Sequence, residues 1–137
     1  MSYNLRKISP LDLKASTGIG VKIPFSTQNV FSIVYSTKEQ LKYNLINYLL
    51  TNKRERIFSP NFGANIRKRL FEQITENSLD DIKQSIILDI ESYFTNVNIV
   101  NLDVVGDSDN HLISIFFSYN ILNTNENDNV VLSIQNI

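Results

Sequence analysis

Two kinds of side chain in this sequence could carry out acid–base chemistry: one histidine, and a pair of carboxylates around a basic segment. A serine nucleophile needs a histidine beside it, and His111 has Ser108 and Ser114 near it in sequence only. The surrounding residues predict a turn followed by a strand, so we interpret His111 as a strand-edge residue without a catalytic role. Glu55 and Glu72 flank the basic segment and could face one another as the two carboxylates of glycoside hydrolysis.

The neighbours of Glu55 argue against glycoside hydrolysis. Lys53, Arg54 and Arg56 surround it in sequence. Nearby positive charges favour the ionised carboxylate over the protonated acid that this reaction needs. We therefore assign no catalytic residue and keep a glycosidase only as an alternative.

Other reactive sites are excluded by composition. The sequence has no cysteine, which rules out disulfides, thiolate nucleophiles and cysteine-bound zinc. Its single histidine cannot form a multi-histidine metal site. Gly18-Ile19-Gly20 is followed by Val21, so the third glycine of a dinucleotide-binding loop is missing. We expect no metal and no cofactor.

The charged residues instead indicate a contact surface. Residues 1–70 contain twelve Lys and Arg against three Asp and Glu, whereas residues 71–137 contain one Lys against eleven Asp and Glu. The two halves could balance one another within the fold, or they could form a polarised surface that attracts oppositely charged protein partners. Nucleic acid is a less suitable partner, because the acidic half would repel phosphate.

The basic residues are concentrated in one segment. Six of the thirteen fall within residues 53–69: Lys53, Arg54, Arg56, Arg67, Lys68 and Arg69. Such a cluster is often only a solvated helix face, but this density makes partner binding an equal alternative. Pro60 and Gly63 bracket a predicted turn, and a larger residue at Gly63 should impair the loop if this position needs positive φ. We expect the aromatic residues Phe58, Phe62 and Phe71 to anchor the segment.

Length and hydropathy favour one cytoplasmic domain. No apolar run approaches the roughly 20 residues that span a membrane, and the N-terminus lacks the apolar stretch of a secretory signal. We therefore expect no membrane partner. A chain of 137 residues fits one domain. We expect an extended arm at residues 1–17 and a single domain at residues 18–137.

Apolar periodicity predicts three helices. Ser36 and Glu39 have the spacing of a capping box, and leucines four residues apart follow, which predicts a helix that ends near residues 51–52. The same spacing predicts a short helix over residues 66–74. The longest helical pattern begins at Asn77-Ser78 and continues to residue 94.

The apolar period then changes from about 3.6 to 2, which predicts strands. Val100, Leu102 and Val104 are expected on one face of the first strand, followed by strands at residues 113–121 and 130–134. Residues 106–110 and 124–129 are expected to form a turn and a loop. Shorter extended runs are expected at residues 21–25 and 30–35. The predicted fold is α+β, with about three helices packed on a small, mainly antiparallel sheet.

The Asn-rich loop before the last strand has two interpretations. It contains Asn125 and Asn129, and such loops are most often only turns. Because it adjoins a terminal strand that contains Val131, this strand could instead pair with the edge of another chain.

Three ordered motifs resemble the small baseplate wedge proteins of contractile phage tails, which have relatives in type VI secretion and other contractile injection machines. The most specific motif is Glu55-Arg56, Pro60-x-Phe62-Gly63 and Leu70-Phe71-Glu72. Gly18-x-Gly20 and Pro24-Phe25 resemble the N-terminal segment of the family. Its C-terminal loop and strand are resembled by Thr124-Asn125 and Asp128-Asn129-x-Val131. The match covers residues 18–134.

Two features depart from the family pattern. Arg54 stands where members often have a glycine before Glu-Arg. Phe94, Thr95 and Asn96 align with a Glu-Pro-Arg triplet that many members carry. Contacts made by that triplet are therefore not expected in this chain.

The resemblance implies a non-enzymatic structural subunit of a tail baseplate, located in a phage virion and assembled in the host cytoplasm, or in a related injection machine. Family members are similar to the interlocking domain of the sheath subunit and are thought to template the first sheath ring by sharing strands. The implied partners are other wedge proteins and the tail sheath protein. Some members were named acidic lysozymes, so a muramidase-like glycosidase is the alternative.

These expectations assign residues to two roles. Partner contacts are expected at Arg54, Arg56, Arg67, Lys68, Arg69, Asn125, Asn129 and Val131. The motif residues are Glu55, Pro60, Phe62, Gly63, Leu70, Phe71 and Glu72, of which Pro60, Phe62, Gly63 and Phe71 are expected to hold the fold.

Overall fold

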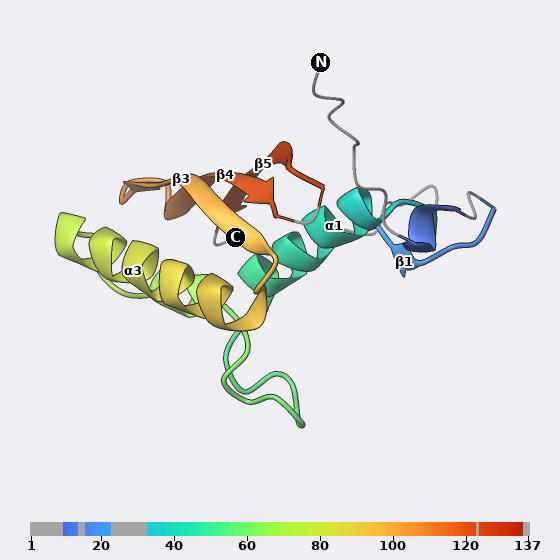
Figure 1. Ribbon diagram of the computed structural model, residues 1–137. Helices are drawn as coiled ribbons and strands as arrows, with labels where there is room; N and C mark the ends of the chain where they lie inside the picture. The colour runs from blue at the N-terminus through green and yellow to red at the C-terminus, as the bar shows by residue number, and fades with distance from the viewer. Residues whose placement is uncertain (1–9, 14–15, 23–32, 123, 136–137) are drawn as a thin grey trace, which may run out of the picture.

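The computed structural model describes residues 10–13, 16–22, 33–122 and 124–135. Its main sheet has three antiparallel strands in the order β3 (Val97–Asp107), β4 (Leu112–Ile121) and β5 (Glu126–Gln135). The helices α1 (Thr37–Leu50) and α3 (Glu76–Tyr93) cover one face of this sheet, α3 against β3 and α1 against β5 (Figure 1). The predicted α+β fold class is confirmed.

The core lies between this sheet face and the two long helices. Alternate residues of β4 are buried, namely Ile113, Ile115, Phe117, Tyr119 and Ile121, as their period of two predicted. The helices contribute Leu45, Tyr48, Leu49, Ile82, Ile86 and Ile90. Full burial of one such side chain stabilises the fold by about 1.5–3 kcal/mol. This shared core fixes the ends of α1 and α3 relative to each other.

Helix α1 begins as expected, and an N-terminal turn helps to hold its start. The hydroxyl of Ser36 accepts a hydrogen bond from the backbone N–H of Glu39 at 3.3 Å. The backbone N–H and the hydroxyl of Thr37 donate to the two carboxylate oxygens of Asp12, each at 2.7 Å. A carboxylate is favourable there because the first backbone N–H groups of a helix carry partial positive charge.

Asp12 lies in a 3-10 turn, η1 (Pro10–Leu13), so this part of the predicted arm is not extended. The boundary between residues 17 and 18 stays a prediction. Beyond the start of α1, β1 (Gly20–Val21) pairs with β2 (Ile33–Val34) in a second small sheet. Pro24 and Phe25 of the predicted N-terminal motif lie outside the described residues.

Two helix boundaries differ from the prediction. The short helix α2 (Ile66–Arg69) ends well before residue 74, with Leu70 as its C-cap. Helix α3 begins at Glu76 because Thr75 caps it, and Ser78 completes the capping box from inside the first turn. Asn77 and Ser78 were predicted to start this helix, but they already lie within it.

Strand β3 contains a bulge that the apolar pattern of the sequence did not indicate. The register with β4 shifts between Ile99 and Asn101, so Val100 is an extra residue. Val100 is 64% exposed, whereas Leu102 is buried. The prediction that Val100 shares a face with Leu102 is therefore wrong, because a bulge reverses the alternation along its strand.

Strand β5 begins earlier than predicted, within the expected polar loop. Residues 126–129 pair in register with residues 118–121 of β4. The side-chain amide of Asn120 donates to Asn127 Oδ1 at 2.7 Å, and the Tyr119 hydroxyl donates to Asp128 Oδ2 at 3.3 Å. These cross-strand pairs outweigh the low strand propensity of asparagine and aspartate.

Candidate partner-binding surface

A loop of residues 52–65 projects from the body between α1 and α2 (Figure 1). Its base is fastened to the last turn of α1: the backbone N–H groups of Ala64 and Asn65 donate to the carbonyl oxygens of Tyr48 and Thr51, at 3.2 and 3.3 Å. Further out, the N–H of Arg54 donates to the carbonyl oxygen of Pro60 at 2.7 Å. The loop is thus closed on itself and tied to the helix that carries it.

Gly63 makes the close approach at the base of this loop possible. Its φ is +122°, which meets the condition under which the sequence favoured glycine here. A Cβ atom at this position would lie 2.5 Å from the carbonyl oxygen of Thr51. Both the conformation and the space therefore require glycine.

Phe62 anchors the loop to the core. Its buried ring packs edge-on against Tyr48 and Tyr93, with ring centroids 5.5 and 5.4 Å apart. The guanidinium carbon of Arg56 lies 4.0 Å from the centroid of the same ring. This cation–π contact holds one basic side chain of the loop in a defined position.

The other two aromatic residues do not anchor the segment, and this expectation was wrong. Phe58 is 99% exposed and Phe71 is 76% exposed. Phe58 and the 90% exposed Ile57 form the apolar tip of the loop, beyond the hydrogen bond between Arg54 and Pro60. Pro60 itself is also exposed. Their isolation follows from the closure of the loop, which carries the tip away from the core.

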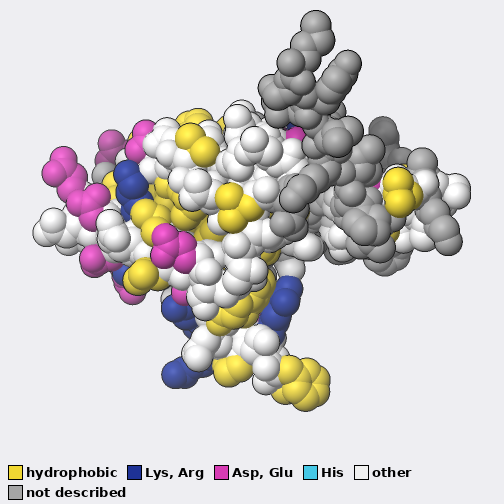
Figure 2. Space-filling view, in the orientation of Figure 1, with side chains coloured by type: hydrophobic (Ala, Val, Ile, Leu, Met, Phe, Trp, Pro, Cys, Tyr) yellow, Lys and Arg dark blue, Asp and Glu magenta, His cyan; other side chains and the backbone are white. Residues whose placement is uncertain are grey.

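Basic side chains lie beside the projecting loop on the face that Figure 2 shows. Arg54, Arg56, Arg67 and Lys68 are exposed, and Arg69 is partly buried. None of these five forms an ion pair within the described parts of the chain. These predicted contact cations are therefore unpaired within the described residues, and their role in partner contacts stays a prediction.

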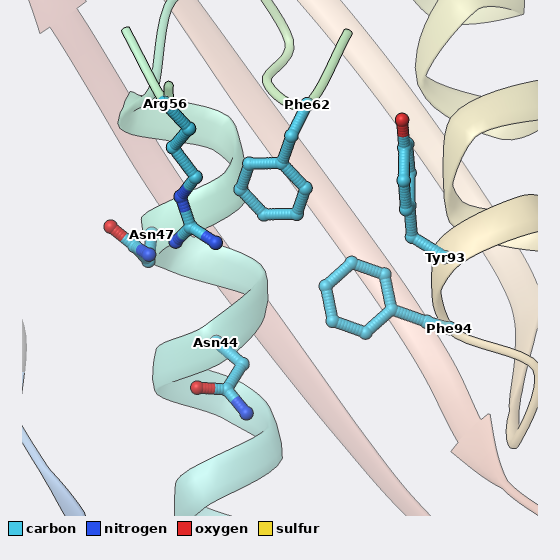
Figure 3. Close-up of a pocket in the computed structure, with 6 residues that line it drawn as sticks. All are labelled: Asn44, Asn47, Arg56, Phe62, Tyr93 and Phe94. Carbon is cyan, nitrogen blue, oxygen red and sulfur yellow. The ribbon is translucent and has the colours of Figure 1, made fainter. Parts of the chain in front are cut away.

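A shallow groove lies beside the loop (Figure 3). Its volume is about 270 Å³, and it is lined by Asn44, Asn47, Arg56, Phe62, Tyr93 and Phe94. These residues come from α1, the loop and the end of α3. None of the six lining side chains is a carboxylate. No sequence pattern indicated this groove, because three separate elements contribute to it.

A partly buried hydrogen bond links the two long helices. The hydroxyl of Tyr48 on α1 donates to Asp89 Oδ2 on α3 at 2.6 Å. Burial and this bond to a carboxylate both raise the pKa of Tyr48 well above its ordinary value. Tyr48 therefore stays protonated and acts as a structural donor.

The candidate catalytic residues do not form a reaction site. Glu55 is exposed and accepts a hydrogen bond from the side-chain amide of Asn52 at 2.9 Å. Glu72 is exposed after the end of α2, and neither residue lines the groove. His111 is exposed at φ +47° in the β3–β4 turn, not in a strand as predicted. Among the described residues, no group of three His, Cys, Asp or Glu side chains could hold a metal ion.

Strand β5 provides a second exposed surface. It is an outer strand of the three-stranded sheet, and its far edge pairs with no other described strand. Asn129 and Val131 are exposed on the sheet face opposite the core. Asn125 lies in the preceding turn at φ +56° and donates its N–H to the carbonyl oxygen of Ile121 at 2.7 Å.

The positions aligned with the family triplet have structural roles here. Phe94 packs edge-on against Tyr48, with ring centroids 6.1 Å apart, and lines the groove. The carbonyl oxygens of Phe94 and Asn96 accept hydrogen bonds from Val97 and Leu122. Phe94 therefore contributes an aromatic wall where the family pattern has a glutamate.

Comparison with known proteins agrees with the motif resemblance. No family model matches the chain. It is 22% identical over 82 residues to the baseplate wedge protein gp25 of Enterobacteria phage T4, a match that covers 60% of this chain and 62% of that protein. The chain thus spans less than two thirds of this relative's length. The resemblance to the small baseplate wedge proteins is confirmed as a sequence similarity.

Two solved structures share the fold. A candidate tail lysozyme of Geobacter sulfurreducens superimposes with a TM-score of 0.65 at 20% identity, covering 76% of this chain and 95% of that one. A chain of the anti-feeding prophage (AFP) baseplate gives a TM-score of 0.52 at 18% identity, with 86% of each chain covered. At these identities the likeness establishes the fold. Separately, none of the described helices is long and apolar enough to cross a membrane.

Proposed function

We propose that this chain is a structural, non-enzymatic subunit in the baseplate of a contractile phage tail or a related injection machine. The similarity to a baseplate wedge protein and the shared fold support this role. The observation that carries it is the apolar tip, because Ile57 and Phe58 stand almost fully exposed on a loop whose base is fastened. Large apolar side chains displayed in this way mark protein interaction sites.

The apolar tip and the basic residues around it would dock another wedge protein. Burial of Phe58 in a partner pocket would contribute about 1.5–3 kcal/mol. Arg54, Arg56, Arg67, Lys68 and Arg69 would attract a pocket rimmed by carboxylates and set its orientation.

The second docking surface would be the edge of β5, which would pair with a strand of the tail sheath protein and template the first sheath ring. An outer strand offers unpaired backbone N–H and C=O groups to an incoming strand. Asn125, Asn129 and Val131 would contact that strand. The working location would be the tail baseplate of the virion, after assembly in the host cytoplasm, without a cofactor, nucleic acid or membrane.

Copurification with the wedge proteins of a baseplate that contains this chain tests the docking role. Phe58→Ser should weaken copurification about tenfold or more, which corresponds to the loss of one buried aromatic anchor. Leu88→Ser is the matched control, because Leu88 is an exposed apolar residue on α3 and not part of the loop. Undiminished copurification of Phe58→Ser would remove the apolar tip from the proposal.

A muramidase-like glycosidase is the alternative, and one structural relative carries the name of a candidate tail lysozyme. The exposure of Glu55 and Glu72 outside the groove argues against it. Purified protein should release no fragments from peptidoglycan. Turnover that is abolished by Glu55→Gln or Glu72→Gln would establish the enzyme instead.

A further inference from the structure

The groove of Figure 3 combines a fixed positive charge with aromatic walls. Arg56 lies over the ring of Phe62, and its guanidinium forms no ion pair within the described residues. An arginine stacked on a ring is already ordered, so binding through its free N–H groups costs less conformational entropy. The planar group that fits such an edge is a carboxylate, which can accept two parallel hydrogen bonds.

The α1 side chains beside Arg56 can recognise a peptide backbone (Figure 3). Asn44 and Asn47 lie on neighbouring turns of α1, and both side chains line the groove. Neither side-chain amide has a hydrogen-bond partner within the described part of the molecule. Each amide offers a hydrogen-bond donor and an acceptor. These groups match the C=O and N–H groups of an extended peptide backbone.

The aromatic residues complete the site. Tyr93 and Phe94 lie together on the far side of Phe62 from Arg56 (Figure 3). Their rings form an apolar surface on which a side chain of the bound segment could pack. The lining thus presents cationic, amide and aromatic parts within one groove of about 270 Å³.

We propose that this groove binds an extended acidic segment of a partner protein. A Glu or Asp carboxylate would accept hydrogen bonds from Arg56, the backbone would contact Asn44 and Asn47, and a neighbouring apolar side chain would pack against Tyr93 and Phe94. Charge favours this occupant: Arg54 adds a further exposed cation nearby, and no lining side chain is acidic. A neutral saccharide has no carboxylate to accept hydrogen bonds from Arg56. The groove in turn has no acidic side chain that could accept hydrogen bonds from the sugar hydroxyl groups.

This inference deepens the proposed docking role by naming the chemistry of the partner at Arg56. The two can fail separately, because a peptide assay requires no baseplate component. Groove binding would hold in a protein that never enters a tail, and the apolar tip could dock a wedge subunit while the groove stays empty.

The test uses nuclear magnetic resonance titration of the whole chain with two capped peptides, acetyl-Gly-Glu-Phe-Gly-amide and its Gln counterpart. The Glu peptide should shift the resonances of Asn44, Asn47 and Arg56 and bind about tenfold more tightly than the Gln peptide. Tri-N-acetylglucosamine is the saccharide arm and should cause no shift at these residues.

Arg56→Gln should abolish the preference for the Glu peptide. Lys38→Gln removes a positive charge from the first turn of α1, outside the groove lining, so its affinity should stay within about twofold of wild type. Unchanged spectra away from the groove establish that each variant is folded. Equal binding of the two peptides, absence of shifts at the groove, or a preference for the saccharide would each overturn the inference.

Discussion

Gly63 decides the shape of the projecting loop at the scale of a single residue. It brings the returning chain against the last carbonyl groups of α1, where Ala64 and Asn65 donate their backbone N–H groups. Any side chain at this position would collide with backbone atoms, which cannot move aside as a flexible side chain can. The position of the apolar tip therefore depends on this residue.

Gly63→Ala should lower the free energy of unfolding by about 1–3 kcal/mol, because alanine is strained at this φ and its Cβ meets the carbonyl oxygen of Thr51. Urea denaturation measures the change. Ser59→Ala in the same exposed loop is the control and should change the stability by less than about 0.5 kcal/mol. Equal stability of both variants would show that Gly63 is not constrained.

Two tyrosines should make the free energy of unfolding decrease at alkaline pH. Burial, followed by the interaction with Asp89, raises the pKa of Tyr48. Burial, followed by the charge of Asp128, raises the pKa of Tyr119. The folded chain therefore holds these protons more strongly than the unfolded chain, whose tyrosines have a pKa of about 10. The stability that they contribute is complete below that pH and decreases as the pH rises through it.

We expect the unfolding free energy of the wild type to fall more steeply between roughly pH 9 and 11 than that of Tyr48→Phe, which has no proton to lose. At neutral pH the variant should be less stable by about 1–2 kcal/mol, because Asp89 loses its donor. Urea denaturation across this pH range provides the comparison. Parallel pH profiles for the two proteins would contradict the assignment.

At the scale of elements, the sequence predicted the existence and type of each main helix and strand. The stripe of α3 and the alternation of β4 were unambiguous, because each buries one face against the same core. The boundaries were less accurate. Thr75 caps α3 before the expected start, and the bulge at Val100 cannot be read from an alternating pattern, since either register keeps apolar residues inward.

The candidate site was only partly predictable. Gly63 and Phe62 could be assigned because turn chemistry and an aromatic anchor leave a local signal. The exposure of Phe58 could not be predicted, because an aromatic residue is expected to be buried unless the path of the chain is known. The groove could not be predicted from the sequence either, because Asn44, Arg56 and Tyr93 come together only through tertiary packing.

Strand β5 allows a test of strand sharing at the element scale. Val131→Lys should change the unfolding free energy by no more than about 1 kcal/mol, because the side chain is exposed. It should nevertheless prevent sheath growth from purified baseplates, since a lysine on an edge strand opposes pairing with a further strand. Electron microscopy of sheath nucleation measures this effect.

Val100→Lys is the matched control at the other edge of the sheet, where the side chain is exposed on the bulge of β3. It should leave sheath nucleation unchanged. Normal nucleation by Val131→Lys, or equal loss in both variants, would rule out a specific role for the β5 edge.

At the scale of the whole molecule, the charge asymmetry of the sequence becomes a separation in space. Figure 2 shows Lys and Arg side chains gathered around the projecting loop, while Asp and Glu side chains gather at the other end of the visible face. The two halves of the sequence therefore do not simply neutralise one another on this face. Such a distribution favours an oriented encounter with charged partners.

Charge reversal at Arg67 and Lys68 to Glu should weaken binding to wedge proteins about tenfold at low salt, with a smaller effect at high salt. Both side chains are exposed, so the unfolding free energy should change by less than about 1 kcal/mol. Lys38→Glu with Lys83→Glu makes the same change in net charge on α1 and α3, and serves as the control in the binding assay. Equal affinities for the two double variants would mean that only net charge matters.

Hydrogen–deuterium exchange of the chain, free and within purified tail baseplates, tests the proposed assembly role most directly. We expect slower exchange in the baseplate at residues 54–62 around the apolar tip and at residues 126–135 of β5. The outer face of α3 should exchange as it does in the free protein. If residues 54–62 and 126–135 exchanged in the baseplate as fast as in the free protein, the proposed role would be contradicted. Absence of the chain from purified baseplates would also contradict it.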